Sequence, residues 1–128
     1  MKTGRFPSLF AALCGILLFS GLSFADTLGD LARAAQKPLV ADFGLKRCGQ
    51  CIAQGKVIDE LGAKIGDKVS FRFIHIKDEE KVVEEYKVLV VPTLIFFDAQ
   101  GKEVFRNVGL MQADTITAKL RELGLLKK

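Results

Sequence analysis

Residues 38–51 read PLVADFGLKRCGQC, and this stretch decides the fold. Its first six residues are apolar except for Asp42, which is typical of a strand buried inside a sheet. A short loop then leads to two cysteines, Cys48 and Cys51, that are separated by two residues. Apolar residues at helical spacing follow over 51–64. We therefore expect both cysteines at the amino end of a helix that follows a buried strand.

The segment before this stretch has a helical pattern. Thr27 and Asp30 have the spacing of a capping box, in which the two side chains satisfy backbone N–H groups at the start of a helix. Leu28, Leu31 and Ala35 would then form the inward face of that helix. The helix should end before Pro38, which also begins the buried strand.

The segments after the cysteine helix complete an alternating order of helices and strands. They are expected as a strand over 69–76, a helix with acids at 78–80 that ends near Tyr86, strands over 93–97 and 103–108 joined by a tight hairpin at 98–101, and a last helix with Ile116, Leu120 and Leu123 inward. The phenylalanine-rich segments at 71–76 and 94–97 are predicted to be core. The order predicts an α/β domain with a mixed central sheet of about four strands and helices on both faces.

The amino end of the chain has the pattern of a secretory signal peptide over residues 1–25. It begins with basic residues, continues with an apolar stretch over 9–19, and has small residues at 23–25 that suit cleavage after Ala25. An uncleaved membrane anchor is the alternative, although the polar residues after the apolar stretch leave it shorter than the roughly 20 residues of a spanning helix. Residues 26–128 then form one domain of an exported, periplasmic protein.

Charge and cysteine count narrow the function classes. Lys2 and Arg5 leave with the signal peptide, which lowers the net charge from +4 to +2, and no basic run is interleaved with aromatic residues. These features argue against a nucleic-acid-binding protein. Cys14 also leaves, so Cys48 and Cys51 are the pair that remains. A disulfide across two intervening residues closes a very small loop and adds little stability, so a reactive role is favoured.

Two cysteines separated by two residues also occur in zinc sites and haem attachment sites. A zinc site needs four ligands, and the residues after the signal offer only His75 beyond the cysteines, so we expect no metal and no cofactor other than the redox-active disulfide. Haem attachment requires a histidine after the second cysteine, where Ile52 stands. His75 lies on a strand that is remote in sequence from Cys48 and is interpreted as structural. Redox chemistry is the remaining interpretation.

Five stretches occur in a specific order and spacing: Val40-Ala41-Asp42-Phe43, Cys48-Gly49-Gln50-Cys51, Tyr86, Val91-Pro92-Thr93 and Val108-Gly109. They resemble the landmarks of the thioredoxin family, and the similarity covers nearly all of residues 32–123. The resemblance implies a thioredoxin fold in which Pro92 follows a cis peptide bond beside the disulfide. It also implies that Val91, Pro92 and Gly109 contact a substrate chain.

The residue types around the cysteines suit thiol–disulfide exchange. A thiolate is the attacking species, and an amino-terminal helix position favours it, so Cys48 is predicted to be the nucleophile and Cys51 the resolving thiol. Lys46 and Arg47 add positive charge beside Cys48 and are predicted, with the intervening Gly49 and Gln50, to modulate its thiolate. The alternative for the two basic residues is a solvated loop.

Asp42 is the unusual residue of the buried strand. An ionised carboxylate is costly in an apolar setting, and the resemblance implies that this acid relays a proton to or from Cys51. The family's buried lysine partner is replaced by Phe73, so desolvation should raise the pKa of Asp42 further. Gln50 stands where the family has proline, and Arg47 where it has tryptophan. The reduction potential and partner surface are therefore not carried over.

These features predict a protein-disulfide reductase that acts on exported client proteins and is recharged by a membrane electron carrier, and we expect a monomer. The same chemistry run in reverse would make the protein a disulfide oxidase or isomerase. A hypothesis of another class is a binding module with an inert structural disulfide. The sequence leaves the direction of electron flow open, because a change of about 30 mV in potential corresponds to only about 1.4 kcal/mol.

Overall fold

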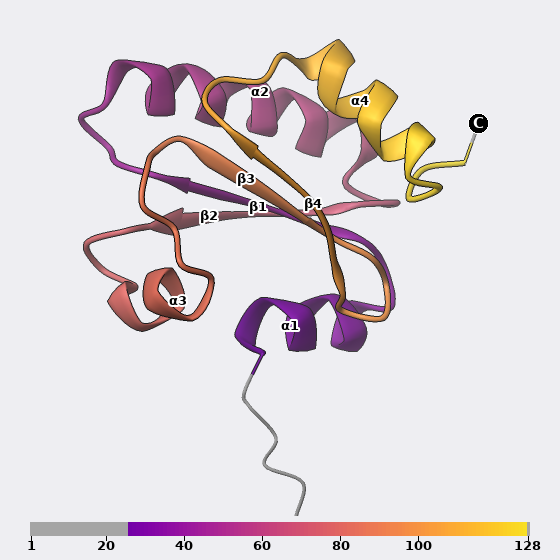
Figure 1. Cartoon of the computed structure of the whole chain (residues 1–128). Helices are drawn as coiled ribbons and strands as arrows, with labels where there is room; N and C mark the ends of the chain where they lie inside the picture. The colour runs from indigo at the N-terminus through magenta and orange to yellow at the C-terminus, as the bar shows by residue number, and fades with distance from the viewer. Residues whose placement is uncertain (1–25, 128) are drawn as a thin grey trace, which may run out of the picture.

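The computed structural model describes residues 26–127 (Figure 1). Its elements follow in the order α1 (Thr27–Ala35), β1 (Leu39–Gly44), α2 (Gly49–Ile65), β2 (Ser70–His75), α3 (Glu80–Glu85), β3 (Thr93–Phe97), β4 (Glu103–Val108) and α4 (Ala113–Glu122). This is the predicted order. The predicted signal peptide lies outside the described residues, and within residues 26–127 no helix has the length and apolar character needed to cross a membrane.

The four strands form one mixed sheet in the order β2-β1-β3-β4. Strand β1 runs parallel to β2 and antiparallel to β3, and β3 runs antiparallel to β4. Helices α1 and α3 lie on one face of the sheet and α2 and α4 on the other (Figure 1). The prediction of an α/β domain with helices on both faces is therefore confirmed.

The central strand β1 supplies side chains to both halves of the core. All six of its residues are buried. Because side chains alternate along a strand, Ala41 and Phe43 pack with Leu28 of α1, while Val40 packs with Ile58 of α2. Asp42 has the same parity as Val40 and so lies on the face that α2 covers. The strand thus brings a carboxylate beneath the helix that begins at the cysteines.

Helix α1 differs from its prediction at its start and in its inward face. Asp26, and not Thr27, is the N-cap, and its Oδ1 accepts the N–H of Gly29 at 3.0 Å. Leu31 is 39% exposed and Ala35 is also exposed, whereas Leu28 and Ala32 are buried. The predicted inward face was therefore wrong beyond Leu28.

Close approach to the β3–β4 hairpin explains this rotation of α1. A Cβ atom on Gly29 would lie 2.5 Å from the carbonyl oxygen of Gly101, so the face that meets the hairpin must carry small residues. Gly101 has a φ of +84°, as its place in the tight turn requires, and its N–H donates to Asp98 at 3.0 Å. Hydrophobicity alone does not reveal such a backbone contact.

Tyr86, which follows α3, ties that segment to the amino end of α1. Its hydroxyl accepts the N–H of Leu28 at 2.8 Å and donates to the carboxylate of Asp26. Thr27 donates its N–H and its hydroxyl to the two carboxylate oxygens of Glu85, at 2.7 and 2.8 Å. The unpaired N–H groups at the start of α1 are thus satisfied by side chains from the middle of the chain.

Strand β2 is an edge strand, and its burial is lower than predicted. Phe96 and Phe97 of β3 are buried, as the core prediction requires. Phe71 of β2 is half-buried, and Phe73 is 40% exposed, so the core prediction was wrong for Phe73. An edge strand has a neighbour on one side only, which leaves a large side chain near its end open to solvent.

Candidate functional site

The two cysteines lie at the amino end of α2. Cys48 and Cys51 form a disulfide with their Cα atoms 5.1 Å apart. Cys48 is the N-cap residue of α2, and its Sγ accepts the N–H of Cys51 at 3.2 Å. The first turn of α2 contains no acidic residue. A negative charge on Cys48 would therefore meet helix N–H groups and the positive end of the helix dipole.

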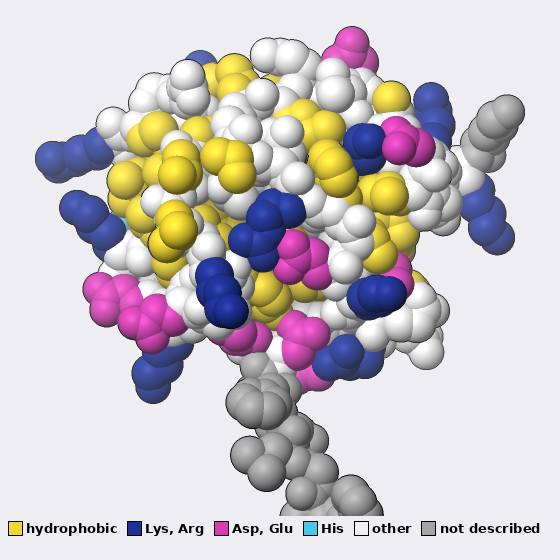
Figure 2. All heavy atoms as spheres, viewed as in Figure 1, with side chains coloured by type: hydrophobic (Ala, Val, Ile, Leu, Met, Phe, Trp, Pro, Cys, Tyr) yellow, Lys and Arg dark blue, Asp and Glu magenta, His cyan; other side chains and the backbone are white. Residues whose placement is uncertain are grey.

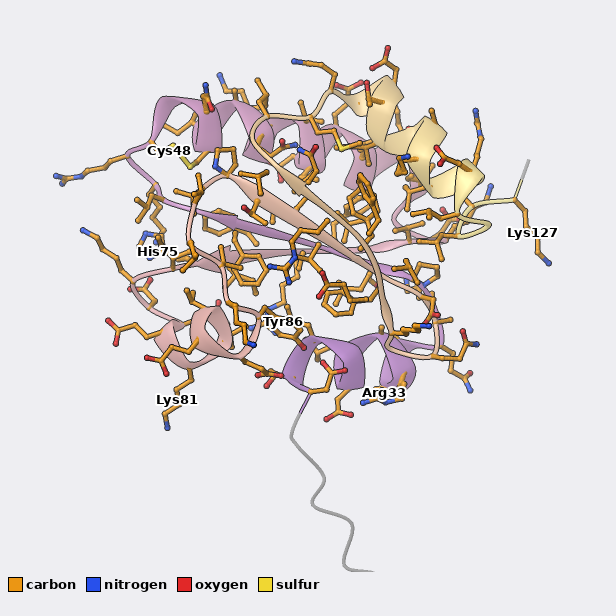
Figure 3. All side chains as sticks on the ribbon, viewed as in Figure 1. Arg33, Cys48, His75, Lys81, Tyr86 and Lys127 are labelled. Atoms are coloured by element: carbon orange, nitrogen blue, oxygen red, sulfur yellow. A yellow bond between two sulfur atoms is a disulfide. The ribbon has the colours of Figure 1, made fainter. Side chains whose placement is uncertain are left out.

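The two sulfur atoms differ in their access to solvent. Cys48 is partly exposed, whereas Cys51 is 2% exposed. Figure 3 shows Cys48 at one end of the sheet, where the chain turns from β1 into α2. An approaching partner can therefore reach Cys48, while Cys51 is sheltered behind it.

Sheet topology brings the other predicted site residues to the same end of the molecule. Because β1 and β2 are parallel, the carboxyl end of β2 at His75 lies beside the end of β1. Because β3 is antiparallel to β1, and β4 to β3, the start of β3 after Pro92 and the end of β4 at Val108 lie there too. The cysteines thus have β2 on one flank and β3 with β4 on the other.

Asp42 is fully buried, and its carboxylate oxygens have no hydrogen-bond partner within residues 26–127. Desolvation by burial, with a smaller contribution from the charge of Asp59, raises the pKa of Asp42 from its ordinary 3.8 to about 7. At neutral pH the carboxyl is therefore poised between its acidic and basic forms.

The strand places Asp42 near Cys51. Gly44 lies two residues after Asp42 on the same face, and a Cβ atom on Gly44 would be 3.2 Å from the Cβ of Cys51. Two strand residues span about 7 Å. Asp42 and Cys51 therefore lie near each other on the face of the sheet that α2 covers.

Phe73 occupies the position opposite Asp42 in the parallel register of β1 and β2. A Cβ atom on Gly44 would be 3.0 Å from the Phe73 ring as well as close to Cys51. Because Gly44 has no side chain, the Phe73 ring and Cys51 can both lie close to the backbone of β1 at this position. The ring offers Asp42 no charge, which agrees with desolvation as the main cause of its raised pKa.

The loop before β3 and the end of β4 are joined beside the cysteines. The Val91–Pro92 peptide bond is cis, as the resemblance implies, and the Pro92 carbonyl accepts the N–H of Gly109 at 2.8 Å. Gly109 has a φ of +98°, and a Cβ atom there would meet nothing within 4 Å. Within residues 26–127 the backbone N–H and C=O of Val91 have no hydrogen-bond partner. Among the described residues no side chain covers the surface at Gly109, and the backbone N–H and C=O of Val91 are free to bind another chain.

Basic side chains line the other flank of Cys48. A cavity of about 330 Å³ is lined by Leu45, Lys46, Arg47, Cys48, His75 and Lys77. His75 is remote in sequence from Cys48, but parallel pairing of β2 with β1 places it at this cavity (Figure 3). Its Nδ1 is 2.7 Å from Oδ2 of Asp78. Among residues 26–127 no three His, Cys, Asp or Glu side chains gather as metal ligands.

Gln54 is a site residue that sequence reasoning missed. Its fully buried amide donates to the carbonyl of Met111 at 3.1 Å and accepts the N–H of Met111 at 2.8 Å. The pair of bonds holds the loop after Gly109 against the cysteine helix. A signal was present, since Gln54 falls between Cys51 and Ile58 in the inward stripe of α2, where an apolar residue is expected.

Replacing Gln54 with leucine is expected to lower the free energy of unfolding by about 2 to 4 kcal/mol, because both backbone groups of Met111 lose their buried partner. Urea denaturation of the oxidised protein measures the change. Gln100→Leu, at an exposed hairpin position, is the matched control and should change stability by less than about 0.5 kcal/mol. A loss for Gln54→Leu as small as that of the control would contradict the bridging role.

Comparison with known proteins identifies relatives of this chain. The family model for a thioredoxin-like domain matches residues 29–124. The thioredoxin-like protein CITRX, chloroplastic, of Oryza sativa subsp. indica is 32% identical over 94 residues, which cover 72% of this chain and 50% of that protein. The thioredoxin of Alicyclobacillus acidocaldarius is 24% identical over 102 residues, which cover 80% of this chain and 96% of that protein. The chain thus spans half of the rice protein and nearly all of the bacterial one.

Solved structures have the same architecture. The X-ray structure of Fasciola hepatica thioredoxin superposes with a TM-score of 0.66 at 25% sequence identity, over 74% of this chain and 89% of that one. The match includes the mixed four-stranded sheet with helices on both faces. The shared feature is thus the fold.

Proposed function

This chain belongs to the thioredoxin family, and from that premise we propose that it is a thiol–disulfide oxidoreductase that reduces disulfides in exported client proteins. The observation that carries the proposal is the asymmetric cysteine pair at the start of α2. Cys48 is accessible and caps the helix, whereas Cys51 is buried behind it. This arrangement favours one attacking thiol and one resolving thiol over an inert structural bridge.

The reductive reaction proceeds in two exchanges. The Cys48 thiolate attacks one sulfur of a client disulfide, and the other client sulfur leaves as a thiolate. Cys51 passes its proton to the Asp42 carboxylate and attacks the Cys48 sulfur, which forms the Cys48–Cys51 bond and breaks the bond to the client, whose second sulfur leaves as a thiolate. Two electrons pass from the dithiol to the client. A pKa near 7 allows Asp42 to accept this proton at neutral pH.

The client chain is expected to bind beside the cis proline. The free N–H and C=O of Val91 can pair with an extended client segment, as a strand adds to a sheet edge, and the open surface at Gly109 leaves room for it. Lys46 and Arg47 lie on the loop before Cys48 and favour its thiolate, while Gly49 and Gln50 form the first turn of α2 between the cysteines. No metal or organic cofactor enters this scheme.

Export and recharging are the remaining parts of the proposal. Their support is the signal-peptide pattern of residues 1–25, which suits a periplasmic protein. A reductase in that compartment needs electrons from the other side of the membrane, so a membrane electron carrier is its expected partner. The protein would act as a monomer on one client at a time.

The equilibrium with glutathione tests the direction of electron flow. A reductase should have a potential below that of the glutathione couple, so the Cys48–Cys51 disulfide should persist even with a large excess of reduced glutathione. Alkylation and mass measurement give the oxidised fraction at each ratio of reduced to oxidised glutathione. A disulfide that is half reduced at ratios that match a potential near about −120 mV would identify an oxidase instead.

A further inference from the structure

The two flanks of Cys48 differ in chemistry. On the side of β3 and β4, exposed hydrophobic side chains gather near the cis proline and the end of β4: Leu89, Val90, Val108 and Leu110. On the side of β2, the cavity beside Cys48 is lined by Lys46, Arg47, Lys77 and His75. Figure 2 shows hydrophobic side chains gathered on the left of the face in view, with Lys and Arg side chains projecting from its left border.

The basic flank has charge that the protein itself leaves unneutralised. Lys46, Arg47 and Lys77 form no ion pair within residues 26–127, and no acidic side chain lines the cavity in that part of the chain. Asp78 is the nearest acid in sequence, and its Oδ2 is engaged with His75 at 2.7 Å. A cluster of free cations around a partly exposed sulfur creates a local positive potential that attracts anions.

An extended client segment must cross both flanks. If it pairs with Val91, it lies over the cis-proline loop on the apolar side. Its own sulfur must then reach Cys48, and the residues beyond that sulfur continue toward Lys77 and His75 at the end of β2. One part of the client therefore meets apolar side chains, and the part on the other side of its cysteine meets cations.

We infer that the cationic flank formed by Lys46, Arg47 and Lys77 selects client segments that carry acidic residues next to their reactive cysteine. The inference rests on the proposed exchange reaction and names the class of substrate for that same site. Complementary charge acts mainly on the rate of encounter, and it can raise an association rate by about tenfold to a thousandfold at low ionic strength. The chemistry of the exchange itself is unchanged.

Matched peptides test this selectivity with the reduced full-length protein. Three peptides of equal length each contain one disulfide and differ only in residues beside the cysteines, which are Glu, Gln or Lys. We expect the Glu peptide to oxidise the protein at least about tenfold faster than the Gln peptide at low salt, and the Lys peptide to react slowest. Salt at about 0.5 M should reduce the ratio between Glu and Gln peptides to below about twofold.

Charge-matched variants assign the effect to the cluster. In the Lys46→Gln, Arg47→Gln, Lys77→Gln variant the ratio between Glu and Gln peptides should fall below about twofold at low salt. The control removes three exposed lysines from the opposite end of the sheet, Lys68→Gln, Lys102→Gln and Lys127→Gln, and should keep a ratio above about fivefold. Lys127 is labelled far from Cys48 in Figure 3. The ratio is used because Lys46 and Arg47 also affect the thiolate of Cys48.

The outcomes separate this inference from the proposed function. Equal, measurable rates for the three peptides in the unaltered protein overturn the selectivity and leave the exchange reaction intact. A ratio that survives in the cluster variant overturns the assignment to these residues. Oxidised glutathione is a small anionic disulfide that serves as a further probe. If it oxidised the protein as fast as the Glu peptide, the cationic flank would select any anionic disulfide and not an extended client segment. If no peptide oxidises the protein at either salt concentration, the exchange reaction itself fails.

Discussion

The reduced Cys51→Ser protein is expected to accumulate mixed disulfides with clients through Cys48, whereas Cys48→Ser accumulates none and loses at least about a thousandfold in exchange rate. In the first variant the accessible nucleophile is present, but the buried thiol that would release the client is missing. In the second variant the remaining thiol is 2% exposed and cannot be reached by a folded client. A serine hydroxyl does not ionise near neutral pH and so cannot replace the thiolate.

Electrophoresis without reductant and mass measurement of the trapped adduct check this result. The accompanying measurement is the rate of alkylation of reduced Cys48 in the Cys51→Ser protein as a function of pH. The rate should reach half its maximum at a pH below about 8.5, which is the pKa of an ordinary thiol. If Cys48→Ser also trapped clients, or if Cys48 were alkylated no faster than a free cysteine, the disulfide would be structural and the proposed exchange would be wrong.

Asp42→Asn is expected to stabilise the oxidised protein by roughly 4 kcal/mol at about pH 8 and to change its stability little at about pH 4. Burial raises the pKa of Asp42 to about 7, so the folded protein holds a proton that the unfolded chain loses near its ordinary pKa of 3.8. The free energy of unfolding of the unaltered protein therefore falls as pH rises between these two values, and the full cost of the buried charge is present above about pH 7. The neutral amide of asparagine has no such cost.

Urea denaturation at several pH values measures this difference. Asp59→Asn is the matched control, because Asp59 is an exposed acid of α2 that contributes to the raised pKa of Asp42 as a smaller cause. It should show a much smaller stabilisation above about pH 7. The same Asp42→Asn protein should release trapped clients more slowly, by about a hundredfold, because Cys51 loses its proton acceptor. If the stability difference between the two proteins did not change with pH, the pKa of Asp42 would be the same in the folded and the unfolded chain, and burial would not raise it.

Much of the fold could be predicted from periodicity and from the cysteine stretch. Strands β3 and β4 begin and end as predicted, because a hairpin with glycine at its last turn position separates a buried, largely apolar strand from a strand of mixed polarity. Hydrophobic periodicity predicted the structure less accurately where the backbones of two elements are in close contact. The face of α1 depends on the close contact of Gly29 with Gly101, which lies far along the chain and leaves no periodic signal.

The site was predictable where a residue type is itself unusual for its setting. A carboxylate in the buried strand β1 indicated Asp42, and the raised pKa agrees with its burial. Other site residues depend on which strands are neighbours. His75 and Lys77 lie beside Cys48 because β2 pairs in parallel with β1. The sequence of neither strand alone predicts this pairing. Gln54 could have been found by asking why a polar side chain occupies an inward position of α2.

The tie between α1 and the segment after α3 sets an order of events during synthesis. Helix α1 is the first element of the described chain to be made, yet its leading N–H groups are completed by Glu85 and by the hydroxyl of Tyr86. About sixty residues must therefore emerge before α1 can settle, and an isolated helix of its length is marginal in water. Until Tyr86 has been made, the leading N–H groups of α1 lack these side-chain partners.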